Sequence, residues 1–131
     1  MKVLKYGMVF ILPALFVVGV KIGSWWSFSP VIFAFVFIPI LELLFKPNAK
    51  NLSSAEKEMR LNDKAYDFML YLVVPVLYVS ITLYLIAITT RSFSTIELVG
   101  LTFSLGVLLG GMGINVAHEL GHRHTGYERF M

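Results

Sequence analysis

The sequence lacks cysteine and has few charges, and both absences limit its chemistry. Of its 131 residues, 15% are charged and 57% are hydrophobic, with a mean hydropathy of +0.77. Soluble domains are roughly 45–50% apolar, so this composition indicates a membrane protein. With no cysteine, disulfides and iron–sulfur clusters are excluded. A metal bound here must use histidine and carboxylate ligands, which suit iron, manganese or zinc.

The weak net charge of +3 does not indicate a nucleic-acid partner. The basic residues lie beside apolar segments, where lipid headgroups and the positive-inside rule explain them. We therefore expect membrane lipid, and no nucleic acid, as the surroundings of this chain.

The charges separate four apolar runs, and we predict an all-α transmembrane protein with spans at about 6–22, 30–45, 68–90 and 96–117. A bilayer core of roughly 30 Å requires about 20 apolar residues per helix. The first two spans are expected to form a hairpin across the polar break GSWWSFSP, where Trp25 and Trp26 suit the headgroup region. A cleaved signal peptide is not expected, because no A-x-A-like site follows the first run.

The basic residues predict the orientation of the spans. Nine of them lie at the N-terminus, in the second connector and in the tail, against Lys21 and Arg91 in the other two connectors. By the positive-inside rule, both termini of this segment are predicted to be cytoplasmic. The second connector also contains a capping-box pattern at Ser53 and Glu56, which fits either a short surface helix or a solvated loop.

Glycine and proline are concentrated in the spans. Gly106 and Gly110 form a G-x-x-x-G motif in the fourth span; small residues let helices approach closely, so we predict that this span is a packed central helix. The spans also contain Pro13, Pro39 and Pro75. These prolines either kink the helices to admit a long apolar substrate or are simply tolerated, and we adopt the second explanation.

Two carboxylates lie near the predicted inner face of the membrane. Glu42 could support a metal site there, but we favour an interfacial residue that pairs with Lys46, four residues later. Asp67 opens the third span, where a negative residue in the first turn of a helix needs no further explanation.

The three histidines all lie between positions 118 and 124. Four residues are about 400° on an α-helix, so His118 and His122 face nearly the same way, one turn apart, and could bind metal. Glu119 lies about 100° round the helix, where it could act as a base or as an outer-shell acceptor. His124 falls roughly on the side opposite His122 and is taken as a surface residue unless the helix breaks near Gly126. The alternative is that these histidines bind no metal and instead form hydrogen bonds with the backbone or with lipid at the membrane interface.

Two metal chemistries match this spacing. HELGH satisfies H-E-x-x-H, the zinc metalloprotease signature, but a zinc site would need a third ligand, for which Glu42 and Asp67 are the candidates at suitable depth. A membrane iron oxygenase would need further histidine clusters, which this chain does not contain.

A longer stretch resembles one family. GINVAHELGHR, followed closely by YERFM, is similar to the first histidine box of the integral-membrane alkane 1-monooxygenases, which belong to the membrane fatty-acid desaturase and hydroxylase superfamily. The matching residues are Asn115, His118, Glu119, Leu120, His122, Arg123, Glu128, Arg129 and Phe130. FIPILELLFKPNAKN and KAYDFMLYLVVPVLY also resemble that family's segment between its second and third helices, so the resemblance covers essentially the whole chain.

The resemblance implies a fold, a cofactor and an activity. Residues 1–131 would be the N-terminal part of a six-helix membrane domain, in the bacterial inner membrane, with its histidine box at 118–122 on the cytoplasmic face. His118 and His122 would be ligands of a non-haem di-iron centre, whereas Glu119 matches a family position without a settled role. Such enzymes use O₂ and electrons from rubredoxin or a ferredoxin to hydroxylate the terminal methyl of an alkane.

The later histidine boxes of that family are absent from this chain, so we expect it to be inactive alone. Two histidines do not complete a di-iron site. An intramembrane zinc protease and a small non-enzymatic membrane protein remain the alternatives.

Overall fold

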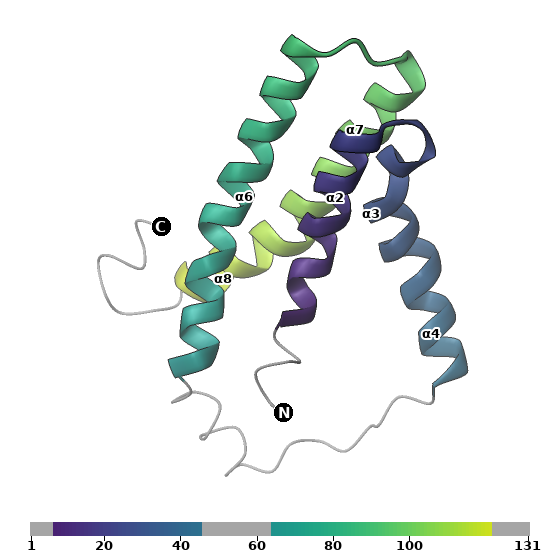
Figure 1. Ribbon diagram of the computed structural model, residues 1–131. Coiled ribbons are helices and arrows are strands. Elements are labelled where there is room, and N and C mark those ends of the chain that lie inside the picture. The colour runs from purple at the N-terminus through teal and green to yellow at the C-terminus, as the bar shows by residue number, and fades with distance from the viewer. Residues whose placement is uncertain (1–6, 46–63, 122–131) are drawn as a thin grey trace.

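The structure is a computed structural model that describes residues 7–45 and 64–121 (Figure 1). Every element in these two stretches is helical, which confirms the all-α prediction. The elements are, in order, η1 (Met8–Phe10), α2 (Ile11–Ile22), η2 (Ser24–Phe28), α3 (Ser29–Ile32), η3 (Phe33–Phe37), α4 (Ile38–Leu44), α6 (Lys64–Thr90), α7 (Thr95–Leu108), η4 (Leu109–Gly113) and α8 (Ile114–Gly121).

These elements join end to end into longer helical rods. Within the described residues, three rods are long and apolar enough to cross a membrane: Ser24–Leu44, Asp67–Thr90 and Thr95–Gly121. A shorter apolar helix, Met8–Ile22, precedes them. Three of the four predicted spans are therefore confirmed as helices long enough to cross a membrane, although Ser24–Leu44 and Thr95–Gly121 are longer than predicted; the first is described from Met8 onward.

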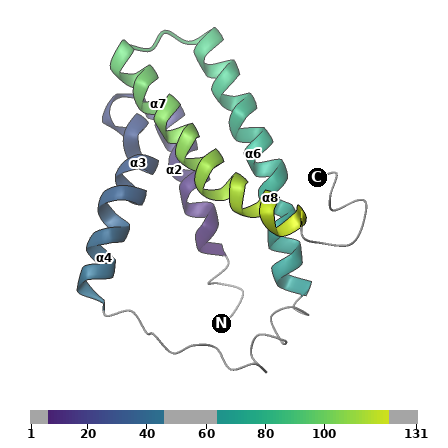
Figure 2. The same cartoon turned by 180° about the vertical axis from the view of Figure 1, so that it is seen from behind.

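The rods alternate in direction, and both hairpin turns lie at the same end of the molecule (Figures 1 and 2). One turn joins α2 to η2, and the other joins α6 to α7. The last rod runs obliquely, so that α8 lies beside the first half of α6 in both views. The histidine-bearing helix end is thus far from the hairpin turns.

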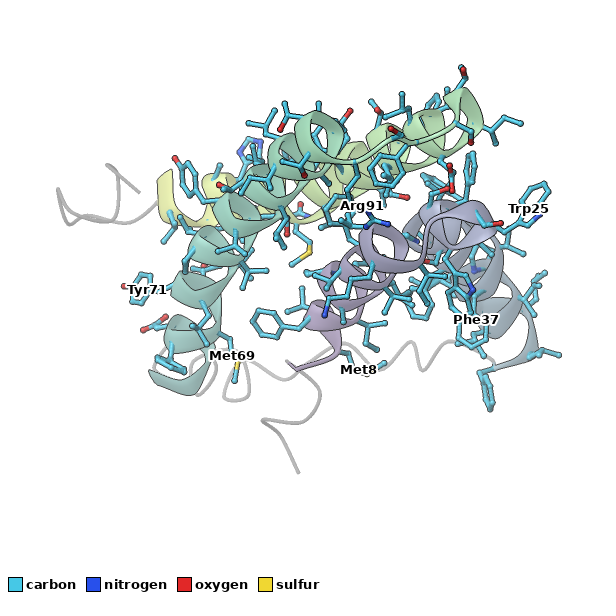
Figure 3. The ribbon with its side chains drawn as sticks, turned by 45° about the horizontal axis from the view of Figure 1, so that its top comes forward. Met8, Trp25, Phe37, Met69, Tyr71 and Arg91 are labelled. Carbon is cyan, nitrogen blue, oxygen red and sulfur yellow. The ribbon has the colours of Figure 1, made fainter. Side chains whose placement is uncertain are left out.

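The first hairpin turn is much tighter than predicted. GSWWSFSP was expected to be a polar connector, but η2 already begins at Ser24 and only Gly23 and Ser24 have positive φ, at 71° and 51°. The serines of this segment bond its own backbone, as Ser27 Oγ does to the Ser24 carbonyl at 2.6 Å, so their polarity does not interrupt the helix. Pro30 lies in the first turn of α3, where a missing N–H costs no helical hydrogen bond. Trp25 points outward and is 78% exposed (Figure 3), as expected for the headgroup region.

Small residues bring η2 into close contact with both α2 and α7. A Cβ atom on Gly19 would lie 2.6 Å from the Trp26 carbonyl oxygen, and one on Gly100 would lie 2.5 Å from Ser27 Oγ. Ser104 Oγ also donates to the Ser27 carbonyl at 2.7 Å, and both serines are fully buried. We call this contact between Gly19, Ser27, Gly100 and Ser104 the small-residue junction.

The fourth span is the most buried of the three long rods, in agreement with its prediction as a packed helix. Within residues 7–45 and 64–121, however, no atom of another helix lies within 4 Å of a Cβ built on Gly106 or Gly110, and both glycines are exposed. The face in contact with η2 instead carries Gly100 and Ser104, a small-x-x-x-small pair six residues earlier. A G-x-x-x-G motif identifies a face that permits close approach, whereas the positions of the large apolar residues decide which face turns inward.

One hydrophobic core joins α2, α6 and the last rod. Its buried members are Phe16, Val20, Leu70, Val73, Leu77, Ala87, Leu101, Leu105, Leu108, Met112, Val116 and Leu120.

Proline interrupts these rods only mildly. α6 continues through Pro75, whereas Pro13 lies in the first turns of α2 and Pro39 in the first turn of α4. Before Pro39 the helix widens into a π turn, η3, in which the Ile38 N–H donates to the Phe33 carbonyl. The prolines are thus accommodated locally, which agrees with the expectation that they are tolerated.

The small-residue junction predicts opposite effects for two matched substitutions in the same rod. Gly100→Ala should lower the free energy of unfolding by roughly 1–3 kcal/mol, because its Cβ overlaps η2. Gly106→Ala should leave stability unchanged or raise it by up to about 1 kcal/mol, since alanine favours helix and meets open space. Thermal unfolding of both variants in the same lipid or detergent tests this, and equal effects would contradict the assigned inward face.

Candidate metal centre at the end of α8

The predicted histidine box begins inside a regular helix. α8 continues the rod of α7 and η4 without a break and includes His118 and Glu119. Val116 and Leu120 are buried against α6, with Leu120 only 2% exposed. His118 lies on the exposed side of the same helix, and Glu119 is half-buried. The helix is therefore held along one face while His118 points away from that face.

A π turn lies directly before this helix. In η4 the Ile114 N–H donates to the carbonyl of Leu109, five residues back, so this turn contains one more residue than an α-helical turn. The Asn115 amide then donates to the Gly111 carbonyl at 2.6 Å. The sequence analysis missed both features, although an amide side chain four residues after a glycine, in an apolar helix, was a visible signal.

The structure brings together only part of the predicted site. His122 and His124 lie outside the described residues, so the spacing of the two ligand candidates stays a prediction. Within 7–45 and 64–121, no three His, Asp or Glu side chains are close enough to hold a metal ion. Of the two predicted ligands, the described part of the chain contains one, His118.

Glu42 is not near this imidazole. α4, which carries it, lies on the opposite side of the molecule from α8 in both ribbon views (Figures 1 and 2). Glu42 is exposed and lies at an apolar groove of about 710 Å³ between the start of α2 and the end of α4. A supporting role at the metal site is therefore not favoured, and its pairing with Lys46 involves a residue outside the described part.

Asp67 lies in the first turn of α6, as predicted. It does not join His118 in a three-ligand cluster. A three-ligand zinc site that includes His122 stays a prediction, because His122 lies outside the described residues. The segment around Ser53 and Glu56, for which a surface helix and a solvated loop were both left open, lies outside the described residues.

At the other end of the molecule, two charged side chains tie the hairpin turns together. The Arg91 guanidinium donates to the carbonyls of Val20 and, at 3.3 Å, of Lys21, which end α2. Figure 3 shows the Arg91 side chain reaching from the end of α6 toward α2. A cation near the last carbonyls of a helix also interacts favourably with the helix dipole. Arg91 therefore satisfies backbone acceptors that would otherwise face the membrane interface.

Glu97 makes the complementary contact. Its carboxylate accepts the Ser24 N–H at 2.5 Å and the Ser94 N–H at 2.8 Å, while Ser94 Oγ accepts the Glu97 N–H. Ser94 and Glu97 thus form a capping box at the start of α7. The pattern S-x-x-E is present in the sequence at 94–97, so this cap could have been predicted.

The fold and the site together define a class: a helical membrane protein in which one helix, packed on one face, ends in an outward-directed imidazole. Comparison with known proteins adds a family. The chain is 28% identical to the alkane 1-monooxygenase of Pseudomonas putida over 124 residues, which cover 91% of this chain and 31% of that protein. It is 25% identical over 124 residues to alkane 1-monooxygenase 1 of Alcanivorax borkumensis, covering 91% and 30%. It is 29% identical over 122 residues to the enzyme of Acinetobacter baylyi, covering 85% and 30%.

These similarities support a relationship to membrane alkane hydroxylases and agree with the resemblance seen at the histidine box. The chain spans less than a third of the length of these relatives. No family model and no solved structure matches it.

The hairpin contacts predict that Arg91 stabilises the fold more than its basic neighbour does. Arg91→Met should lower the free energy of unfolding by about 1–2 kcal/mol, because hydrogen bonds from a charged group to the end of α2 are lost. Lys21→Met removes a charge at the same end of the molecule, from an exposed side chain, and should have little effect. Thermal unfolding compares the two variants; equal destabilisation would show that loss of charge, and not the contact, is responsible.

Proposed function

We propose that this chain is the N-terminal transmembrane part of a non-haem di-iron alkane 1-monooxygenase of the membrane desaturase and hydroxylase superfamily. The observation that carries the proposal is the similarity, over most of this chain, to several proteins named alkane 1-monooxygenase. The apolar rods support it, because an alkane dissolves in the bilayer and reaches such an enzyme from there.

The donor chemistry of the histidine box suits iron. Imidazole binds iron well, and the chain has no thiolate that would favour other centres. His118 is exposed on the outer side of α8, so a metal and ligands from another segment can reach it. We assign His118 and His122 as iron ligands, one helical turn apart. When bound, the irons would supply the O₂-activating redox chemistry.

The proposed reaction balances with an external reductant. One C–H bond of the terminal methyl and the O–O bond break; one oxygen atom forms the new hydroxyl group, and the other leaves as water. Two electrons from rubredoxin or a ferredoxin and two protons complete the balance. We place the histidine box and both ends of this segment on the cytoplasmic side of the inner membrane, where such a donor would dock.

The remaining residues of the helix end have supporting tasks. Val116 and Leu120 pack against α6 and hold the box helix in place, because ligands on a fixed helix bind a metal more precisely than ligands on a loop. Glu119 follows His118 in the sequence, and its side chain is half-buried. We propose that its carboxylate lies in the outer shell of the metal site, where carboxylates orient the imidazoles that bind the metal.

The ligand assignment is tested in the complete enzyme by single substitutions. His118→Ala and His122→Ala should each lower the iron content and the conversion of a medium-chain n-alkane to its 1-alcohol by at least about tenfold. His124→Ala is the matched control and should keep both, because this histidine is predicted to face the surface. Iron per protein is measured by elemental analysis and the alcohol by gas chromatography.

The outcomes separate the alternatives. Zinc in place of iron, with no alkane oxidation, would support the protease reading of HELGH. Unchanged metal content in both ligand variants would show that the histidines are incidental, as in a non-enzymatic membrane protein.

A further inference from the structure

The π turn η4 changes the direction in which every later residue of the rod points. An α-helix advances about 100° per residue, and a π turn holds one residue more, so it offsets the rest of the helix by about 100°. Before the turn, the buried face of the rod consists of Leu101, Leu105 and Leu108; after the turn, it consists of Val116 and Leu120. The number of residues in the turn decides whether these two buried faces lie on the same side of the rod.

The angles show that alignment requires the π turn. In an unbroken α-helix, Leu120 would lie about 120° round from Leu108; with one residue absorbed by the turn, it lies about 20° away. Leu108 and Leu120 are in fact both buried, at 0% and 2% exposure. His118 would lie about 80° from Leu108 without the turn and lies about 180° away with it, in agreement with its exposed position.

Asn115 makes the side-chain contact that supports this turn. Its amide donates to the Gly111 carbonyl inside η4 at 2.6 Å, from an exposed position on an apolar rod. In a membrane, where water does not satisfy backbone groups, side chains are one of the partners that satisfy the backbone groups freed by a helix irregularity, and the Asn115 amide is such a partner. Among the described residues, no other helix lies within 4 Å of a Cβ built on Gly110 or Gly111, so no close helix contact in this part of the chain requires glycine there.

We propose that Asn115 is a positioning residue: through its hydrogen bond to Gly111 it holds the π turn, and the π turn points His118 directly away from the core. The claim that this direction helps His118 to bind a metal rests on the proposed function. The direction of His118 does not, because it follows from the π turn and from the packing of α8.

A nitroxide scan tests the direction without any metal. The chain has no cysteine, so single cysteines at positions 114 and 116–121 can be introduced and labelled one at a time in this 131-residue chain, reconstituted in lipid bilayers. Accessibility of each label to O₂, measured by electron paramagnetic resonance, should oscillate along the helix, with its minimum at Val116 and Leu120 and a maximum at His118.

Removing the amide should rotate this pattern. Asn115→Leu, and the smaller Asn115→Ala, should shift its phase by about 100° and raise the accessibility at position 120. Asn115→Ser should keep the native phase, since a hydroxyl donates to the same carbonyl. Deleting Gly111 in the Asn115→Leu background should restore the phase, because it removes the extra residue that the π turn absorbs.

Thr82→Val is the matched control, because Thr82 Oγ1 donates to the Tyr78 carbonyl, also four residues back, in α6, where no π turn is present. It should leave the phase unchanged. An unrotated pattern in both Asn115→Leu and Asn115→Ala would overturn the role of Asn115, even if iron binding at His118 were confirmed. A rotated pattern would support that role even if the protein proved to bind no iron.

Discussion

The close approach of η2 to α2 and α7 is the contact on which the arrangement of the other helices depends. In lipid, helices gain little by hiding apolar surface from one another, so they associate where small side chains allow tight van der Waals contact and hydrogen bonds. Gly19 and Gly100 leave room for the backbone and side chain of Ser27, and the Ser104 hydroxyl bonds the Ser27 carbonyl. This junction fixes the hairpin end of the molecule, from which α6 and the histidine-bearing rod extend.

The polar groups of the described residues are also arranged as a membrane requires, with hydrogen-bond partners inside the protein. No buried side-chain nitrogen or oxygen in them lacks a hydrogen-bond partner, as expected where an unsatisfied group costs several kcal/mol. Arg91 and Glu97 satisfy backbone groups at the two hairpin turns, and Asn115 does so inside the last rod. Polar side chains in this protein therefore act on the backbone more than on one another.

The two ends of the molecule differ in how tightly their helices are held together. At the hairpin end, two charged side chains and the small-residue junction join three helices. At the other end, α8 packs on α6 with one face and leaves His118 exposed on the other. The helix end that carries His118 is therefore packed on one side only among the described residues.

The amino-acid sequence by itself determined the class of the fold, because apolar runs bounded by charges have few other solutions in a membrane. It also predicted the helix that carries His118, and a resemblance to alkane 1-monooxygenases that the comparisons support. The capping box at Ser94 and Glu97 could also have been predicted from the sequence. These features are local: each depends on residues within one or two turns of one another.

Only the tertiary structure decided which face of each helix turns inward. Gly106 and Gly110 had the expected motif and yet lie outside, whereas Gly100 and Ser104 form the contact, because the partner helix and its large side chains select the face. The polar break GSWWSFSP became helix because its serines could bond the backbone beside α2 and α7. The direction of His118 was also beyond the sequence, since a π turn rotates all later residues by about 100°, and only the burial of Val116 and Leu120 beside α6, a helix distant along the chain, shows which face of α8 turns inward.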